Sequence, residues 1–360
     1  MDVAVIGAGQ AGLAVAYHLR DLGPRVALVD AGPRAGGAWQ HRWPSLTLGR
    51  THSLADLPGM RAAGLSFSDA DPRVPARDTV PELMSRYEEA YGLHVARPVR
   101  IVRVTRESGR FVIEAAPGGP VPRLEARAVV NATGTWTAPR VPELPGRDTF
   151  AGRQITTAGY PGAHAFAGLR VAVVGGGLSA LGFMDELAPV ASALRWYTRR
   201  PPVIRDDASS ELGFARGRAA VEAQDAAALA GQLLPSIVSV TGIPLTPPVR
   251  RLKARGLLDS HPMPVRMVPD GLVETDGSVW AADAIIWATG FDHALDHLEP
   301  LGIRGADGGV RVDQGRVVGQ PGLILAGYAG QASTVSAARA ARTSARHVRE
   351  HLSGAADWPA

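Results

Sequence analysis

The chain has 360 residues, enough for two domains of ordinary size, each with its own core. Its 38 Lys and Arg against 34 Asp and Glu leave a net charge of only +4, and no basic cluster alternates with aromatic residues, so nucleic-acid binding is a remote alternative. The absence of cysteine excludes disulfides, thiolate metal sites and any Cys-x-x-Cys redox pair.

The N-terminus enters an apolar run at once, without the charged leader of a signal peptide, so we expect a cytoplasmic protein. This run, 3–6, predicts a strand that leads into Gly-Ala-Gly-Gln-Ala-Gly at 7–12 and a helix-like stretch to 22. That order is typical of a Rossmann unit: Gly7 permits the tight turn, Gly9 the close approach of a pyrophosphate, and Gly12 the packing of helix on strand.

The next predicted strand, 26–29, ends in Asp30, 18 residues past Gly12. Its carboxylate can accept hydrogen bonds from both hydroxyls of an adenosine ribose and would repel a 2′-phosphate. The residues alone therefore predict FAD or NAD at this first site.

A second unit repeats the layout with a predicted strand at 170–174, Gly-Gly-Gly-Leu-Ser-Ala at 175–180, a helix to about 187 and a strand at 193–197. It ends in Arg199 and Arg200, where the first unit has its acid, and guanidinium groups suit a phosphate dianion. We therefore predict NADPH here. The alternative, that both glycine turns only close tight loops, is disfavoured by the full context of both. The residues expected to line this site are Gly175, Gly177, Ser179, Ala180, Arg199 and Arg200.

Two largely apolar runs, 127–134 and 284–290, end in Ala-Thr-Gly. Each predicts a buried strand whose end lets the backbone pass close to a ligand or a neighbouring domain. Their positions indicate that the second unit is inserted into the first. We expect an α/β fold of two Rossmann-like, three-layer domains, with a discontinuous first domain of 1–160 and 291–360 around an NADPH-binding domain of 161–290.

The stretch 226–249 holds no charged residue, but prolines and polar residues interrupt it. We expect broken buried structure that lines substrate access, and no stable membrane insertion; a peripheral membrane contact is the alternative. In the tail, 322–327 predicts a last strand and 333–352 a helix that Ser333 or Thr334 could cap. Four arginines of that helix recur at three- and four-residue spacing, which predicts a solvated basic face.

Taken together, these segments resemble the single-component flavin-containing monooxygenases, or class B flavoprotein monooxygenases, and especially their short bacterial members. Besides both fingerprints, the resemblance rests on Gly-Gly-Ala-Trp at 36–39, Ala-Thr-Gly-Phe-Asp at 288–292, and Gly-Tyr at 327–328 followed by Ala-Ser-Thr at 332–334. It implies FAD at the first site and NADPH at the second. The further cofactor contacts it implies are Gly36, Gly37, Trp39, Gln40, Thr133, Gly134, Thr289, Gly290, Gly327, Ser333 and Thr334.

The resemblance implies an NADPH-consuming monooxygenase that uses dioxygen and a flavin C4a-hydroperoxide to oxygenate a thioether sulfur or an amine nitrogen of a small molecule. Thr51 and His52 are candidates for hydrogen bonds near the flavin, the alternative being a surface or core-satisfied His52. In the family signature Phe-x-Gly-x-x-x-His-x-x-x-Phe/Tyr, Thr156 replaces the histidine, and the asparagine of larger relatives is missing near 48–52.

These departures favour an uncoupled NADPH oxidase or flavin reductase as the first alternative. Baeyer-Villiger oxygenation of ketones is a second, and a sensor that binds FAD without turnover is a third. The histidines show no metal-ligand spacing, so no metal is expected. A homodimer is possible.

Overall fold

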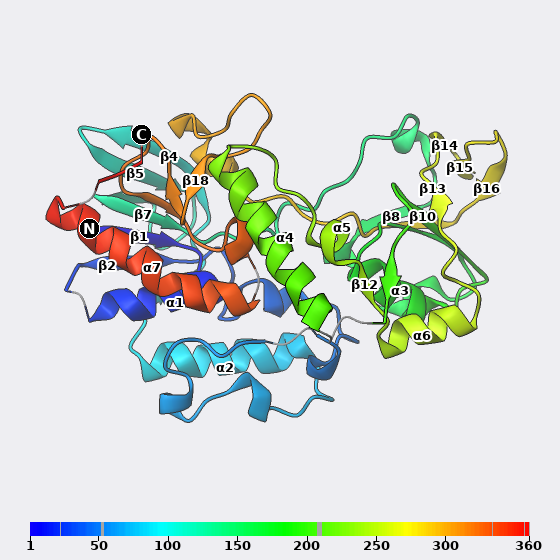
Figure 1. Ribbon diagram of the computed structural model, residues 1–360, viewed down its shortest axis with the longest axis horizontal. Coiled ribbons are helices and arrows are strands. Elements are labelled where there is room, and N and C mark those ends of the chain that lie inside the picture. Colours follow the sequence, from blue (N-terminus) through cyan, green and yellow to red (C-terminus); the bar gives the residue numbers. More distant parts are fainter. Residues whose placement is uncertain (22, 52–53, 207–210, 333, 356, 360) are drawn as a thin grey trace. The chain divides into compact units, whose positions relative to one another are not determined.

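The computed structural model describes residues 1–360 apart from 22, 52–53, 207–210, 333, 356 and 360, and it leaves out the side chains of 238–239 and 334–336. The chain forms two compact units, coloured by sequence in Figure 1. Unit 1 comprises 1–134, 221–235 and 293–360, and unit 2 comprises 135–220 and 236–292. The expected insertion of one α/β unit into a discontinuous other unit is confirmed.

The boundaries of the units differ from those expected at 160 and 290. The chain passes into unit 2 after 134, because strand β8 (Arg153–Thr156) pairs in parallel with β17 (Ala284–Trp287) of the second sheet. In addition, 221–235 belongs to unit 1, where Ala228 joins its buried core. Neither feature has a signal in the local sequence pattern.

Unit 1 is built on a seven-stranded sheet in the order β18-β19-β20-β7-β1-β2-β3. The five strands from β20 to β3 are parallel, and β18 and β19 add an antiparallel hairpin at one edge. The strands are β1 (Val3–Ile6), β2 (Val26–Val29), β3 (Val95–Ala96), β7 (Ala128–Asn131), β18 (Val312–Asp313), β19 (Arg316–Val317) and β20 (Leu323–Leu325).

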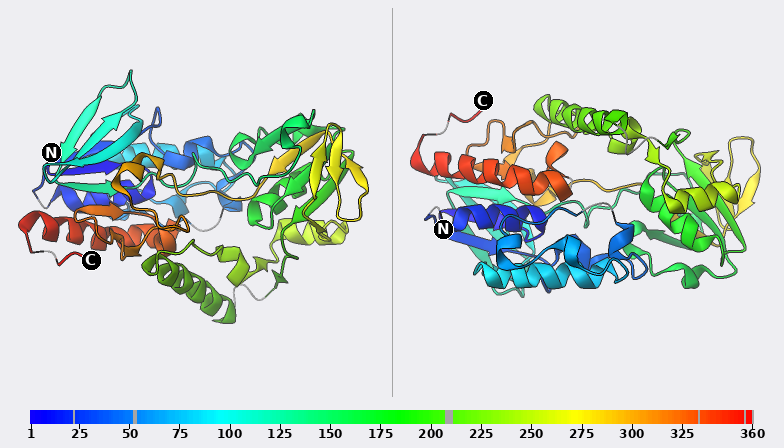
Figure 2. Two further views of the ribbon diagram at one scale, coloured as in Figure 1. Left: turned by 90° about the horizontal axis from the view of Figure 1, so that it is seen from above. Right: turned by 60° about the horizontal axis from the view of Figure 1, so that its bottom comes forward.

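Alternation along the strands builds the layers of unit 1. Val3 and Val5 face a core shared with helices α1 (Gln10–Arg20), α2 (Ala76–Ala90) and α7 (Thr334–Ser353). Ala4 and Ile6 face the opposite core, shared with an antiparallel sheet of β4 (Ile101–Glu107), β5 (Arg110–Ala115) and β6 (Arg123–Ala126). Because successive strand residues point to opposite faces, an all-apolar strand lies between two covering layers. In the left view of Figure 2, the cyan strands of this antiparallel sheet and the red helix α7 lie on opposite sides of the blue N-terminal segment.

Helix α7 confirms the predicted basic face. Ala341, Ala345 and Val348 are buried toward α1 and the sheet, whereas the four arginines lie on its outer side. They are Arg339, Arg342, Arg346 and Arg349.

Unit 2 is built on a five-stranded parallel sheet in the order β13-β10-β9-β17-β8. Its remaining strands are β9 (Arg170–Val174), β10 (Ala193–Thr198) and β13 (His261–Pro262). Helix α3 (Leu178–Leu187) packs on β9 and on α6 (Pro247–Ala254). The other face contributes Ala172 and Ile285 to a core shared with Leu272 of an antiparallel sheet. That sheet comprises β14 (Arg266–Val268), β15 (Gly271–Val273) and β16 (Val279–Ala281).

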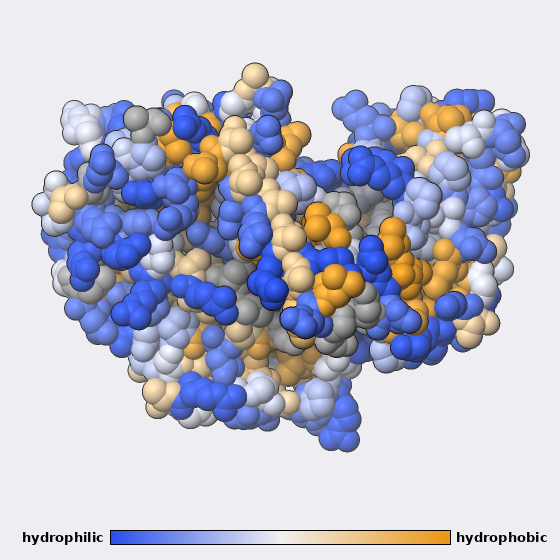
Figure 3. Space-filling view, viewed as in Figure 1, coloured by the Kyte–Doolittle hydropathy of each residue, from blue (hydrophilic) through white to orange (hydrophobic). Residues whose placement is uncertain are grey.

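The segment between β10 and β13 holds further elements: β11 (Ile204–Arg205), α4 (Glu211–Leu229), α5 (Ile237–Thr241) and β12 (Ile243–Pro244). The uncharged stretch was expected to be buried, and this is wrong for two of its four leucines: Leu229 and Leu233 are 51% and 67% exposed. The reason is that they fall at the end of α4 and in the turn after it, where little packs on them. Figure 3 shows that hydrophobic residues, coloured orange, reach the surface at several places. None of the helices in the described part of the chain is both long and apolar enough to cross a membrane.

Candidate functional site

The first glycine fingerprint lies in the turn from β1 to α1, as expected. Gly7 has a φ of +102°, and a Cβ there would lie 2.4 Å from the carbonyl oxygen of Ala132. A Cβ on Gly12 would lie 1.8 Å from the carbonyl oxygen of Gly7. Both positions therefore need glycine for packing within the unit, because no side chain fits such distances.

The middle glycine is different, because the space above it is open. Apart from its chain neighbours, the only described heavy atom within 4 Å of a Cβ on Gly9 would be the Cα of Gly37, at 4.0 Å. In the second fingerprint Gly177 repeats this arrangement, since no atom of the other described residues beyond its chain neighbours lies within 4 Å of a Cβ there. A Cβ on Gly175 would lie 2.1 Å from the carbonyl oxygen of Ala288. Each unit thus holds a backbone cradle at the start of a helix, which fits the pyrophosphate of a dinucleotide.

Asp30 follows β2 at the edge of the sheet where the first fingerprint lies. The residue is 8% exposed, and each side-chain oxygen accepts one backbone hydrogen bond: Oδ2 from the Ala8 amide and Oδ1 from the Gly32 amide, both at 2.7 Å. A Cβ on Gly32 would lie 2.8 Å from Asp30 Oδ1 and 2.6 Å from Gln40 Nε2. The sequence pattern did not point to Gly32. The one feature that could have indicated it is its position two residues after Asp30.

The segment 36–40 folds back onto the first fingerprint. Gly36 has a φ of +114°, and a Cβ on Gly37 would lie 2.8 Å from the Cα of Gly9. The buried Trp39 donates its indole N–H to Gln10 Oε1 (3.1 Å), and Gln40 donates to the carbonyl of Gly37 (3.0 Å). Four expected residues therefore lie together at the cradle.

Gln10 is a site residue that the sequence pattern did not single out. Its Oε1 is taken by Trp39, and its buried Nε2 has no hydrogen-bond partner among the described residues. An unpaired buried donor at a helix N-terminus is suited to a bound anion, because an unmade hydrogen bond in a buried position is costly. This donor is a second feature of the first site that fits a dinucleotide.

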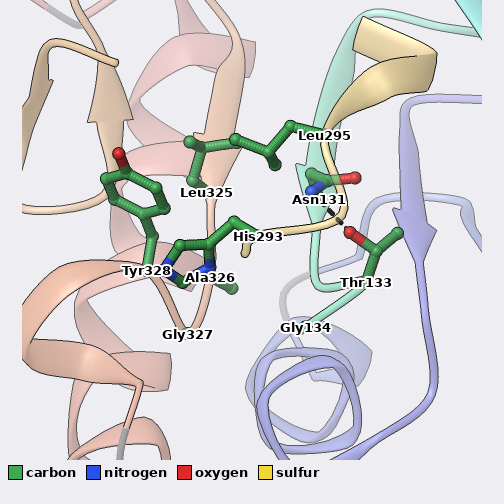
Figure 4. A pocket seen from close by; sticks show the side chains of 9 residues that line it. All are labelled: Asn131, Thr133, Gly134, His293, Leu295, Leu325, Ala326, Gly327 and Tyr328. Atoms are coloured by element: carbon green, nitrogen blue, oxygen red, sulfur yellow. Dashed lines mark hydrogen bonds between the residues drawn. The ribbon is translucent and has the colours of Figure 1, made fainter. Parts of the chain in front are cut away.

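The first Ala-Thr-Gly segment lines a small pocket of about 10 Å³ in unit 1 together with Gly327 (Figure 4). A Cβ on Gly327 would lie 3.2 Å from that of Ala11, so the end of β20 returns to the first fingerprint. Thr133 donates its hydroxyl proton to the carbonyl of Ala294 (2.7 Å), so this proton is used in a hydrogen bond within the protein. Gly134 has a φ of +66°, and a Cβ added there would lie more than 4 Å from every described residue other than its chain neighbours.

Hydrogen bonds between three buried or half-buried polar side chains support this segment. Asn131 donates to Thr133 Oγ1 (3.0 Å) and pairs through Oδ1 with His297 Nε2 (2.7 Å). Burial lowers the pKa of His297 to about 4. The neutral His297 ring therefore donates its Nε2–H to the amide oxygen of Asn131. These hydrogen bonds hold the end of β7 in place.

In unit 2, Arg199 and Arg200 follow β10 and are exposed. Ser179 is half-buried in the first turn of α3, and Ala180 is fully buried where the first fingerprint has its third glycine. Thr289 donates its hydroxyl to the carbonyl of Arg140. The Gly290 carbonyl accepts from the Arg140 amide (2.9 Å), so this turn is bonded to the segment that enters unit 2.

The catalytic candidates receive less support from the geometry. Thr51 donates its hydroxyl to the carbonyl of Leu48 (2.7 Å), at the end of a 3₁₀ turn. His52 and Ser333 lie outside the described residues, and α7 begins at Thr334. Among the described residues, no group of three His, Asp or Glu side chains is placed to hold a metal ion.

Two glycine cradles, one followed by a buried carboxylate and the other by two exposed arginines, define an α/β oxidoreductase with two dinucleotide sites. The profile of the pyridine nucleotide-disulphide oxidoreductase family matches residues 4–213. A solved flavin-containing monooxygenase from Stenotrophomonas maltophilia is 36% identical, with a TM-score of 0.79 over 96% of this chain and 97% of that one.

Two curated relatives match over shorter spans. A Baeyer-Villiger monooxygenase from Streptomyces coelicolor is 33% identical over 55% of this chain and 38% of its own length. Senecionine N-oxygenase from Tyria jacobaeae is 26% identical over 53% of this chain and 45% of its own. The chain spans about half the length of the first curated relatives it matches.

The chain therefore belongs to the pyridine nucleotide-disulphide oxidoreductase family, and within it to the flavin-containing monooxygenases. It is an enzyme, a flavin-dependent monooxygenase of a class that uses FAD and a pyridine nucleotide. Because it has no cysteine, it cannot form the redox disulfide from which the wider family takes its name.

Proposed function

We propose that this protein is an FAD-dependent, NADPH-consuming monooxygenase that oxygenates a soft nucleophile, a thioether sulfur or an amine nitrogen. The observation that carries the proposal is the pair of open cradles with opposite charge beside them. Asp30, next to the first, suits an unmodified ribose, and Arg199 and Arg200, after the second, suit a 2′-phosphate.

Unit 1 would hold FAD. Gly9 leaves room for its pyrophosphate, Gln10 offers the unpaired Nε2–H, and Trp39 provides an aromatic wall. Helix α7 begins seven residues after Gly327, which lies against the start of α1. The positive end of its dipole would favour the negative charge that a reduced flavin carries. The expected contacts of Thr51, His52, Ser333 and Thr334 belong to this same proposal.

Unit 2 would hold NADPH. Gly177 leaves room for the pyrophosphate at the N-terminus of α3, and the two arginines after β10 would bind the 2′-phosphate.

When bound, the flavin accepts a hydride from NADPH and activates dioxygen for transfer of one oxygen atom. The protein's part is to align the two nucleotides and to exclude water rather than to supply an acid or a base. We place this chemistry in the cytoplasm, with dioxygen and a small molecule as partners.

An uncoupled NADPH oxidase is the second candidate. The observation in its favour is Thr156, which ends β8 half-buried where the family signature has a histidine. Baeyer-Villiger oxygenation of ketones is a variant of the first candidate, supported by the 33% identity to an enzyme of that name.

Product analysis separates these candidates. NADPH consumption, hydrogen peroxide and oxygenated product are measured together with a thioether, a tertiary amine and a cyclic ketone. We expect sulfoxide or N-oxide to account for most of the NADPH consumed. Peroxide equal to NADPH with every substrate would establish the oxidase instead, and lactone as the main product would establish the ketone oxygenase.

A further inference from the structure

The first site contains a buried arginine that its glycine fingerprint does not explain. Arg97 directly follows β3, which pairs in parallel with β2, and Asp30 directly follows β2. The backbone is bonded on both sides of this junction: the Asp30 amide donates to the carbonyl of Ala96 (3.1 Å), and the Val99 amide donates to the carbonyl of Asp30 (2.7 Å). Sheet pairing therefore places Arg97 beside the carboxylate proposed to bind ribose.

Glu88 of α2 fixes the guanidinium of Arg97. Nη1 donates to Oε2 and Nη2 donates to Oε1, each at 2.7 Å, and both side chains are 12% exposed. This bidentate geometry sets the plane as well as the position of the guanidinium group. The arginine cannot turn toward solvent without breaking both bonds.

The third nitrogen of the Arg97 guanidinium, Nε, is not used by Glu88. This buried Nε has no hydrogen-bond partner among the described residues, and Asp30 Oδ1 lies 3.9 Å away, too far for a direct bond. Each Asp30 oxygen accepts only one backbone bond, and a carboxylate oxygen has room for a second. A fixed donor and a fixed acceptor thus lie side by side with capacity unused.

We propose that Arg97 is a ribose-recognition residue of the first dinucleotide site. A ribose hydroxyl both donates and accepts, so one hydroxyl can donate to Asp30 and accept from Arg97 Nε. Two hydrogen bonds of about 2.8 Å each can meet at one oxygen beside a 3.9 Å gap. Asp30 alone could only accept hydrogen bonds. Asp30 and Arg97 together favour a group that both donates and accepts one. This inference rests on the proposed function, in which unit 1 holds FAD.

The test uses the full chain, stripped of flavin, with FAD binding followed by the quenching of flavin fluorescence. Arg97→Lys keeps the charge but removes the Nε–H and the fork. The matched control is Arg251→Lys, because Arg251 also forms a two-bond pair, donating from Nε (2.9 Å) and Nη2 (2.6 Å) to Asp185, in unit 2. We expect Arg97→Lys to weaken FAD binding by about tenfold or more, and the control to leave it unchanged.

A ligand series separates recognition from a merely structural role. ADP, 2′-deoxy-ADP and 3′-deoxy-ADP are compared as competitors of FAD, together with the Tm of each flavin-free variant. We expect wild type to prefer ADP over at least one deoxy analogue, and Arg97→Lys to lose most of that preference. Equal weakening of all three competitors, or FAD affinity equal to that of the control, would overturn the inference.

Glu88→Gln provides an independent variant if Arg97→Lys does not fold, because it keeps the shape of the side chain while releasing the fork. It should weaken FAD and reduce the same preference, and no change in either would count against the inference. Wild type that binds no FAD would defeat the proposed function and this inference together. Wild type that binds FAD with Arg97 variants that bind it equally well would defeat the inference alone.

Discussion

Gly9→Ala is expected to yield a folded protein without flavin. Gly9 has φ −80° and ψ −169°, which alanine adopts without strain. In the part of the chain that the structure describes, its Cβ would meet only the Cα of Gly37, at 4.0 Å, beyond its own chain neighbours. The methyl group would instead occupy the space proposed for the pyrophosphate. We expect FAD affinity to fall by about 100-fold, which corresponds to about 3 kcal/mol. The flavin absorbance of the purified protein and its Tm without flavin are the measurements.

Gly12→Ala is the control for this result. Its Cβ would lie 1.8 Å from the carbonyl oxygen of Gly7, so helix and strand would have to separate. Overpacking of this kind costs about 1–3 kcal/mol or more, so both the fold and the flavin should suffer. A Gly9→Ala protein that retains flavin at the wild-type level would show that the cradle does not hold the pyrophosphate.

Arg199→Gln and Arg200→Gln are expected to change the choice of coenzyme. Both side chains are exposed after β10, so their loss should not disturb packing. Each lost charged contact to a 2′-phosphate should weaken NADPH by about 1–3 kcal/mol, while NADH, which lacks that phosphate, should change little. The ratio of kcat/KM for NADPH to that for NADH measures the effect directly.

Arg255→Gln controls for the general loss of positive charge, because Arg255 is also exposed in unit 2 but caps the end of α6. It should leave the ratio unchanged. Equal losses for NADPH and NADH in the Arg199 and Arg200 variants would place the 2′-phosphate elsewhere.

The parts of the fold that local pattern determines could be predicted from the sequence. The strand at 170–174 and the helix ending at 187 match β9 and α3, because apolar runs next to glycine turns admit few alternatives. The boundary after 134 could not be predicted, since it depends on β8 pairing with β17, a partner far along the chain. Within 226–249, the burial of Leu229 and Leu233 was predicted wrongly, because a lack of charge does not show what packs against a segment.

The candidate site likewise has residues that the sequence could predict and residues that it could not. The glycines and Asp30 have fixed spacing in the sequence, so their positions could be predicted. The contact of Gln10 with Trp39 joins residues 29 positions apart, and the pair of Arg97 with Glu88 joins a loop to a helix. Such contacts leave no periodic or motif signal, and they appear only once the backbone is folded.

The central claim is that one chain binds a flavin and a reduced pyridine nucleotide so that a hydride passes between them. Anaerobic titration of the FAD-loaded protein with NADPH tests it most directly, because reduction removes the visible absorbance of oxidised flavin. We predict complete bleaching at one equivalent of NADPH per bound flavin. Bound flavin that keeps its absorbance in excess NADPH would contradict the claim.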